Sequence, residues 1–251
     1  MPRAPLFAAL TALTALATTA VPADARCVGD FARVWPSADG GPVPTNARLL
    51  MHLGGERSVK TDLRALRLEP ARGRPVALRV AVEQSAGDGF RPQRMLVLAP
   101  ERELAPNTRY TLAGAAFPAR GVSYSLTTSA SADTVAPSTG GVATGAFVAE
   151  EFGCGPAHQI PITFSAARDD RSPPGALWGR LRLARNADDA KAGRWLGDIV
   201  TPLEDGALSF GHGMCFGNWP LEPGDRFVAH ASVVDVAMNE SPATQVTLAA
   251  R

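Results

Sequence analysis

The sequence predicts an all-β chain folded as two antiparallel β-sandwiches in tandem. Apolar residues recur at every second position, which is the period of a half-buried strand, and seldom at the spacing of a helix. Turn-forming clusters of Gly, Pro, Asp and Ser separate these runs at short intervals. A stretch from 129 to 141 is rich in Ser, Thr, Gly and Pro and has Val135 as its only bulky apolar residue. We therefore expect two β-sandwich domains, at 27–129 and 138–251, joined by a linker at 130–137.

The first 25 residues have the pattern of a secretory signal peptide. Met1 to Arg3 form a short basic start, Leu6 to Ala20 form an apolar run, and the segment that follows ends in an A-x-A signature at Ala25. The alternative is a retained membrane anchor, but the apolar run has about 15 residues, whereas a spanning helix needs roughly 20. We expect cleavage after Ala25, no membrane span in the mature chain, and an exported protein in the periplasm, on the outer surface or in the medium.

The strands of the first half are indicated by strict alternation. Leu49, Met51 and Leu53 alternate with polar neighbours, and the same pattern recurs further along the chain. The predicted strands of this half cover 48–53, 76–82 and 122–126. Turn clusters predicted beside them are Gly54-Gly55 and Gly87-Asp88-Gly89.

The second half repeats the pattern. Ile160, Ile162 and Phe164 alternate with polar or turn-forming residues, and the predicted strands cover 160–164, 181–183 and 246–248. Turns are predicted at 172–175 and 204–206. Helix-compatible composition occurs only at 60–68 and 186–193, and neither stretch has a long amphipathic stripe, so we expect single turns or short connectors there.

Two short segments share the form Leu-x-Pro-x-x-Arg-aromatic, one in each half. They run from Leu104 to Tyr110 and from Leu221 to Phe227. The proline suits a turn at a sheet corner, the leucine suits the core, and the aromatic residue begins a strand. This pattern resembles the tyrosine corner of fibronectin type III and immunoglobulin-like sandwiches. After Phe227 the chain is similar to the long strand and D-x-x-G-N-E-S turn that end many such modules, with Met238 in place of the usual glycine.

The segment from Trp35 through Val43-Pro44-Thr45-Asn46-Ala47 resembles the opening of bacterial Ig-like domains of the surface-layer type. Together the resemblances imply two tandem immunoglobulin-like or fibronectin III-like sandwiches after the signal peptide. They further imply a module for display, spacing or adhesion, and they transfer no catalytic residue.

The charge balance excludes one class of partner. The chain carries 25 basic and 24 acidic residues, for a formal net charge of +1. A nucleic-acid binder would show a high pI and a basic face. We therefore expect no nucleic-acid partner. The exported module implied above is expected to have a protein or carbohydrate partner at the cell envelope.

The three cysteines predict one structural disulfide. Cys154 and Cys215 both lie in the second half beside glycines, whereas any other pairing would involve the remote Cys27. The Cys154–Cys215 bond would close a loop of about 60 residues, worth on the order of 4 kcal/mol if unstrained. Cys27 would then be a free thiol, an intermolecular partner or a lipid site.

One cluster indicates metal chemistry as an alternative. His212, Met214 and Cys215 place imidazole, thioether and thiol within four residues, and soft donors of this kind suit copper. Their order differs from that of blue-copper loops, and a disulfide would remove the thiolate. We therefore assign no metal, cofactor or catalytic residue. A periplasmic copper carrier stays open as an alternative, and it would be favoured if His212 and Met214 were exposed together.

The sequence shows no strong motif of a catalytic site. Ser209 near His212 lacks an orienting acid, and the sequence has no nucleophile elbow, zincin motif or P-loop. The adjacent pairs Glu150-Glu151, Asp169-Asp170 and Asp188-Asp189 are expected to be solvated turns, where calcium remains an option without a loop motif to support it. A hydrolase would be favoured if a cleft gathered separated carboxylates. Trp178, Trp195 and Trp219 are expected to pack in the core, with a binding face as the alternative.

Overall fold

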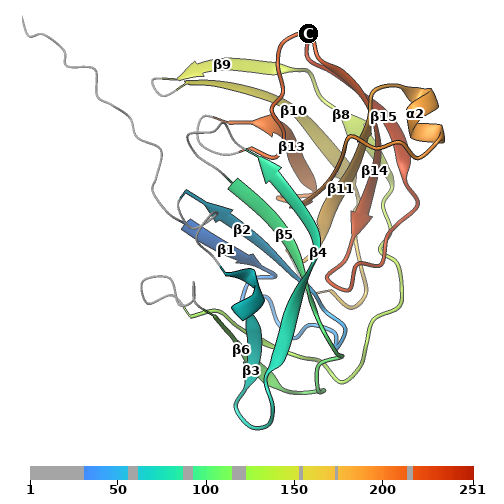
Figure 1. Cartoon of the computed structure of the whole chain (residues 1–251). Coiled ribbons are helices and arrows are strands. Elements are labelled where there is room, and N and C mark those ends of the chain that lie inside the picture. Colours follow the sequence, from blue (N-terminus) through green and yellow to red (C-terminus); the bar gives the residue numbers. More distant parts are fainter. Residues whose placement is uncertain are drawn as a thin grey trace, which may run out of the picture.

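The computed structural model describes residues 31–55, 62–86, 93–114, 123–152, 155–172, 175–213 and 217–251. Antiparallel strands make up nearly all of its regular structure, as Figure 1 shows. Within these ranges the helical elements are the 3-10 turn η1 (Leu63–Ala65) and the short helix α2 (Ala187–Lys191), so the predicted all-β class is confirmed. No helix in the described ranges has the length and apolar character needed to cross a membrane. The predicted signal peptide and Cys27 lie outside the described residues.

The first half forms a seven-stranded sheet in the order β1-β2-β5-β4-β3-β6-β7. The long strand β4 pairs with β5 along most of its length and with β3 at its start, and its register shifts between Val80 and Val82. A shift of this kind bends a strand. The bent β4 therefore connects the strands β1, β2 and β5 on one side of the half to the strands β3, β6 and β7 on the other. The strands are β1 (Phe31–Trp35), β2 (Leu49–Gly54), β3 (Arg67–Pro70), β4 (Val76–Ala86), β5 (Gln93–Pro100), β6 (Arg109–Ala113) and β7 (Ser125–Thr127).

The second half is a sandwich of two four-stranded sheets. One has the order β13-β10-β8 with β9 also paired to β10, and the other has the order β12-β11-β14-β15. Its strands are β8 (Gly141–Thr144), β9 (Val148–Phe152), β10 (Gly155–Ser165), β11 (Trp178–Ala184), β12 (Gly197–Pro202), β13 (Ala207–His212), β14 (Arg226–Val234) and β15 (Thr244–Ala249).

The two halves have the same strand order. When the extra hairpin strand β9 is set aside, the first, second and fifth strands of each half are neighbours, and so are the fourth, third, sixth and seventh. The weak sequence repeat therefore reflects a repeated fold, and tandem antiparallel sandwiches are confirmed. Most predicted strands lie within observed ones, although β7 begins at Ser125 and not at Val122, which is outside the described residues.

The repeated corner motif leads into the sixth strand in both halves. Leu104 and Leu221 are buried, and the hydroxyl of Tyr110 accepts a hydrogen bond from the Ala105 backbone N–H at 2.9 Å. This is the hydrogen bond expected of a tyrosine corner. Phe227 has no hydroxyl, and in its corner the Asp225 carboxylate accepts from the Glu222 N–H at 2.9 Å. Each corner therefore satisfies a turn N–H, but with a different acceptor.

Met238 occupies the turn position where similar modules have glycine. Its φ of 68° lies in the left-handed region, so the turn has the backbone that glycine would favour. The Asp235 carboxylate accepts the Asn239 N–H at 2.9 Å, and the Met238 N–H donates to the Asp235 carbonyl at 3.0 Å. Hydrogen bonds on both sides thus hold the turn with a non-glycine residue.

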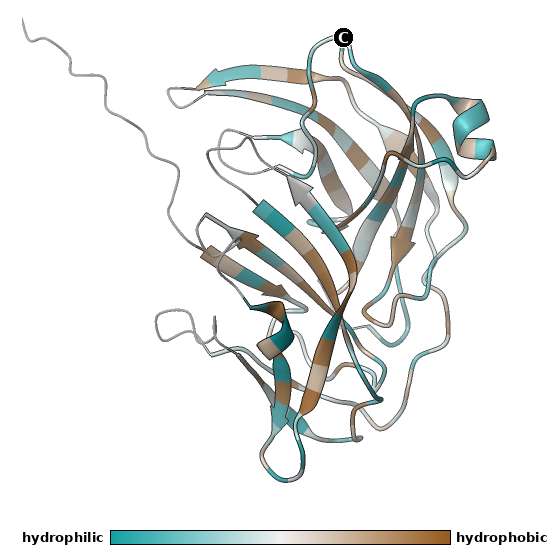
Figure 2. Ribbon diagram, in the orientation of Figure 1, coloured by the Kyte–Doolittle hydropathy of each residue, from teal (hydrophilic) through white to brown (hydrophobic). Residues whose placement is uncertain are grey.

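The cores of the two halves are not separate. One apolar cluster fills the second sandwich, whereas the cluster of the first half also includes Trp178, Val200, Val234 and Val236 of the second. Trp178 is completely buried, which confirms core packing for this tryptophan. Apolar and polar residues alternate along most strands in Figure 2, as two-layer packing requires. The halves therefore bury apolar surface against each other.

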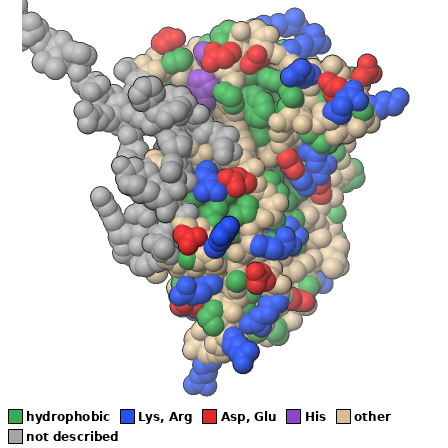
Figure 3. Space-filling view, in the orientation of Figure 1, with side chains coloured by type: hydrophobic (Ala, Val, Ile, Leu, Met, Phe, Trp, Pro, Cys, Tyr) green, Lys and Arg blue, Asp and Glu red, His purple; other side chains and the backbone are tan. Residues whose placement is uncertain are grey.

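On the face shown in Figure 3, basic and acidic side chains are interspersed. This face therefore shows no large patch of a single charge sign among the described residues.

Replacing Trp178 with alanine should destabilise both halves together. The substitution leaves a large cavity in the shared core, and such truncations cost about 3–5 kcal/mol. Calorimetry and urea unfolding should show one transition at lower temperature and lower denaturant concentration. Trp195→Ala is the control, because Trp195 is only partly buried and contacts the ring of His230 outside this cluster. A loss of the same size in both variants, or unfolding of the second half alone, would contradict a shared core.

Candidate functional site

A groove of about 400 Å³ lies between the two halves. The first half supplies residues of β1, β2 and β5, and the second supplies residues of β10, β12 and β13. The lining residues most relevant to binding are Trp35, His52, Gln159, Glu204 and Ser209. Because both halves contribute, the shape of the groove depends on how the shared core sets their relative position.

Hydrogen bonds between the halves reach two residues that line the groove, Gly217 and Asn218. The Gln84 amide donates to the carbonyl of Asn218, and the Gly217 N–H donates to the Gln93 side-chain oxygen at 3.5 Å. The ring of His52 lies 3.0 Å from the same Gln93 oxygen. The pKa of His52 is lowered mainly because burial disfavours the imidazolium, although the Gln93 contact partly opposes this. His52 is therefore a neutral hydrogen-bonding group near pH 7.

The described part of the groove lining holds one carboxylate. This is Glu204, so no two described carboxylates meet there in the way that a glycoside hydrolase requires. Ser209 and His212 lie three positions apart on β13, where alternation directs their side chains to opposite faces. The two are therefore not placed as a nucleophile and its base.

The register of β10 and β13 brings two histidines together. His158 is paired with His212, and their ring centroids lie 5.1 Å apart in an edge arrangement. Both face the interior of the second sandwich, because they continue the buried series Ile160 and Ile162 on β10 and Leu208 and Phe210 on β13. The sequence contained both residues, but the pairing depends on a register that it does not specify.

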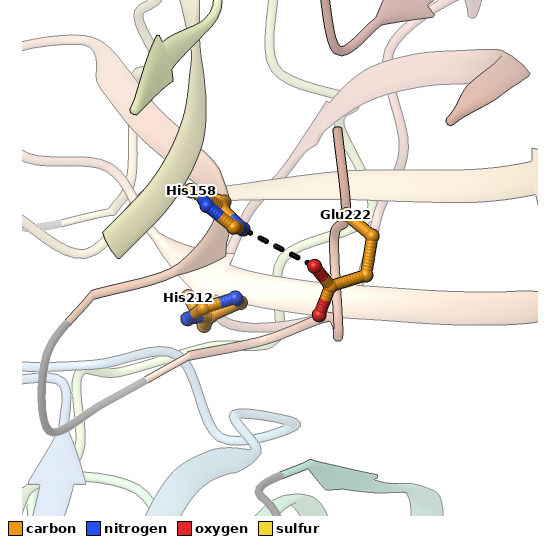
Figure 4. A group of neighbouring side chains, drawn as sticks. All are labelled: His158, His212 and Glu222. Atoms are coloured by element: carbon orange, nitrogen blue, oxygen red, sulfur yellow. Dashed lines mark ion pairs between the residues drawn. The ribbon is translucent and has the colours of Figure 1, made fainter. Parts of the chain in front are cut away.

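Glu222 completes a three-residue group with these histidines, as Figure 4 shows. One potential ligand atom from each residue lies within 4.8 Å of the others. The His158 Nδ1 lies 3.0 Å from the Leu221 carbonyl and 3.5 Å from a Glu222 carboxylate oxygen. A carbonyl oxygen only accepts, so Nδ1 is the donor in this contact, and Nε2 is the ring nitrogen that a metal would use.

Gly211 makes this close pairing possible. Its φ is 126°, and a Cβ at this position would lie 2.1 Å from the His158 carbonyl oxygen. A side chain would therefore push β13 away from β10 and separate the histidines. The Asn218 side chain also holds Gly211 in this position, because its oxygen accepts a hydrogen bond from the Gly211 N–H at 3.0 Å.

Cys154, Cys215 and Met214 lie outside the described residues, so the disulfide stays a prediction and the exposure of Met214 with His212 is not established. The described neighbours are compatible with the disulfide, since Gly155 begins β10 and Gly213 directly follows the adjacent strand β13. The two cysteines thus flank neighbouring antiparallel strands in sequence.

Peptide mapping of the mature protein under non-reducing conditions should find one Cys154–Cys215 cross-link and an unlinked Cys27. Reduction should lower the free energy of unfolding by a value on the order of 4 kcal/mol, because the reduced unfolded chain regains the entropy of a loop of about 60 residues. The double variant Cys154→Ser/Cys215→Ser should unfold like the reduced protein. A cross-link that contains Cys27 would refute the pairing.

The acidic pairs behave differently from one another. Glu150 and Glu151 are exposed as expected, but they lie within strand β9 and not in a turn, whereas Asp188 is exposed in the first turn of α2. Asp169 differs, because the structure gathers it with Asp133 and Asp235. Sequence reasoning treated 130–137 as a linker and so missed Asp133, which is completely buried.

The tryptophans do not form one binding face. Trp178 is in the shared core, and Trp219 packs in the second sandwich, with its ring centroid 6.2 Å from Phe210 and 5.9 Å from Phe227. Trp195 contacts His230. The tryptophan that lines the groove is Trp35, from the first half.

Comparison with known proteins finds no matching family model and no matching curated sequence. Among solved structures, the FN1–FN3 domains of chicken CNTN1 align over 88% of this chain and 65% of theirs, at 8% identity and a TM-score of 0.27. Pullulanase type I from Bacillus subtilis, complexed with maltose, aligns over 82% of this chain and 24% of its own, at 9% identity and a TM-score of 0.24. This chain spans less than two thirds of either structure, and similarities this weak carry no functional inference.

Proposed function

We propose that this protein is an exported, non-catalytic binding module of the bacterial envelope or extracellular space, and that the groove between its halves is the contact surface. The observation that carries the proposal is that residues of both halves line one groove above a shared apolar core. A binding surface works best when its residues are held in place before the ligand arrives, since less conformational freedom is then lost on binding. The N-terminal signal pattern supports export.

The chemistry of the groove suits a polar chain with some apolar surface. Trp35 offers an aromatic ring, while Gln159, Ser209 and Thr201 offer amide and hydroxyl groups. Pockets that recognise small or extended ligands combine such apolar area with a few placed polar groups. A peptide segment or a saccharide of the envelope has this mixture, and either fits the proposed role.

Filling the groove should abolish binding without unfolding the protein. Ser209 is exposed on the outer face of β13, so Ser209→Arg places a long side chain in the groove and leaves the core untouched. Binding would be measured against arrays of envelope glycans and peptides, followed by calorimetry on the best ligand. We expect affinity to fall at least about tenfold, or about 1.4 kcal/mol.

Thr247→Arg is the matched control, because Thr247 is also an exposed strand residue but lies on β15 of the other sheet. It should bind like the unmodified protein. Equal binding by Ser209→Arg and Thr247→Arg would show that the groove is not the contact surface.

A copper carrier is the second candidate, and the observation that favours it is the pairing of His158 and His212 beside Glu222. Imidazole nitrogens and a carboxylate oxygen are suitable ligands for Cu(II). If the protein has this function, it should retain one Cu(II) per chain in native mass spectrometry, and His212→Gln should lose it. His230→Gln is the control, because His230 lies on β14 beside Trp195. Retention by His212→Gln would exclude this group as the copper site.

A further inference from the structure

A second group of ligand-type side chains lies where the two halves join. Asp133 belongs to the segment that connects β7 to β8, Asp169 follows β10, and Asp235 follows β14. One carboxylate oxygen from each lies within 4.8 Å of the others. The group is separate from both the groove lining and the histidine group.

Hydrogen bonds fix each carboxylate in place. Asp133 Oδ1 accepts the Val135 N–H at 2.9 Å, and Asp169 Oδ2 accepts the N–H groups of Arg171 and Ser172 at 3.2 and 2.6 Å. Both oxygens of Asp235 accept from Asn239, at 2.9 Å from the backbone N–H and 2.8 Å from the side chain. A backbone N–H group therefore holds each of the three carboxylates, and the Asn239 side chain adds a further donor to Asp235.

The second oxygen of Asp133 and that of Asp169 have no hydrogen-bond partner among the described residues. Asp133 Oδ2 and Asp169 Oδ1 are buried without a hydrogen bond, and the whole Asp133 side chain is completely buried. The hydroxyl of Ser172, next to Asp169, is likewise buried and unpartnered. A buried carboxylate oxygen without a hydrogen bond or a counterion is strongly unfavourable, so these atoms point to a missing positive partner.

No cationic side chain in the described part of the chain forms an ion pair with these oxygens. The ion pairs found among the described residues include none of the three aspartates. Arg171 directs its guanidinium to Ser131 and Ala132, and Arg48 interacts with Asp235 only at longer range. Three carboxylates whose oxygens lie within 4.8 Å of one another repel one another in the metal-free protein.

We propose that Asp133, Asp169 and Asp235 bind a calcium ion that fixes the junction between the two halves. The donors are all oxygens, which excludes the soft metals that prefer nitrogen and sulfur. Calcium binds oxygens at about 2.3–2.6 Å, so ligands on opposite sides of the ion lie up to about 5 Å apart, in keeping with the observed spacing. Magnesium requires shorter bonds, about 2.0–2.1 Å, and a stricter octahedron.

The ion would connect three parts of the chain. The Asp133 backbone is bound by Asn46 of the first half, whose amide donates to the Asp133 carbonyl at 2.6 Å and accepts its N–H at 2.9 Å. Asn239, beside Asp235 of the second half, donates to the same carbonyl at 3.2 Å. A cation on the three carboxylates would therefore link the connecting segment to loops of the second half, while Asn46 links it to the first.

The test is a calcium titration of the mature protein after treatment with EGTA. We expect one calcium per chain by calorimetry, with a Kd of about 10⁻⁴–10⁻³ M as in other extracellular calcium modules. At a hundredfold excess over Kd the melting temperature should rise by about 5–10 °C. Magnesium at the same concentration should produce a much smaller rise.

The decisive variant is Asp133→Asn. An asparagine oxygen can still accept the Val135 N–H, while the amide removes one charge and can donate to the remaining carboxylates. The variant should therefore melt at a higher temperature than the unmodified protein in EGTA but show no calcium-induced rise. Asp188→Asn, at an exposed position in α2, is the control and should retain the full response.

Three results would overturn the proposal. If the unmodified protein binds no calcium at millimolar concentration, the carboxylates are not a calcium site. If Asp133→Asn responds as strongly as Asp188→Asn, calcium binds elsewhere on the chain. An equal response to magnesium would contradict the choice of ion. None of these measurements involves a groove ligand, so this proposal and the proposed function can fail independently.

Discussion

The burial of Trp178 against the first half is the interaction on which the arrangement of the molecule depends. Trp178 belongs to β11 of the second sandwich, yet it packs in the apolar cluster of the first. A completely buried aromatic side chain of this size contributes a large share of the apolar surface removed from water. Because the contact joins the two sandwiches, it sets their relative position, and both the groove and the aspartate group are consequences of that position.

Polar contacts at the junction add specificity that apolar packing lacks. Apolar surfaces tolerate small shifts against each other, whereas the paired hydrogen bonds between Asn46 and the Asp133 backbone are satisfied in one arrangement only. The nearby carboxylates oppose folding by mutual repulsion unless a cation is present. The junction therefore combines an apolar contact that favours association, an amide contact that sets the geometry, and a charged group whose contribution depends on the solution.

The sequence was sufficient to predict the strands but not to predict which side chains of different strands and loops lie close together. Period-two alternation located the strands around Leu49 and Ile160, and the corner motif located the sixth strand of each half, because these signals are local. The pairing of His158 with His212 depends on strand register, and a shift of one residue would send either side chain to the opposite face. The sequence did not reveal the burial of Asp133, because its Ser-rich and Pro-rich neighbours are typical of a linker. Asp133 lies in the interior through its contact with Asn46, which is distant in the sequence.

One sheet separates the two candidate functions of the second half. On β10 and β13 the residues Gln159 and Ser209 face the groove, while His158 and His212 face the core at the end of the same strands. Alternation along a strand makes these sets independent, because neighbouring side chains project to opposite sides. A groove substitution therefore leaves the histidine pair in place, and a histidine substitution leaves the groove surface in place. Binding by the groove and metal binding by the histidines can for this reason be assigned separately, although both rest on the same two strands.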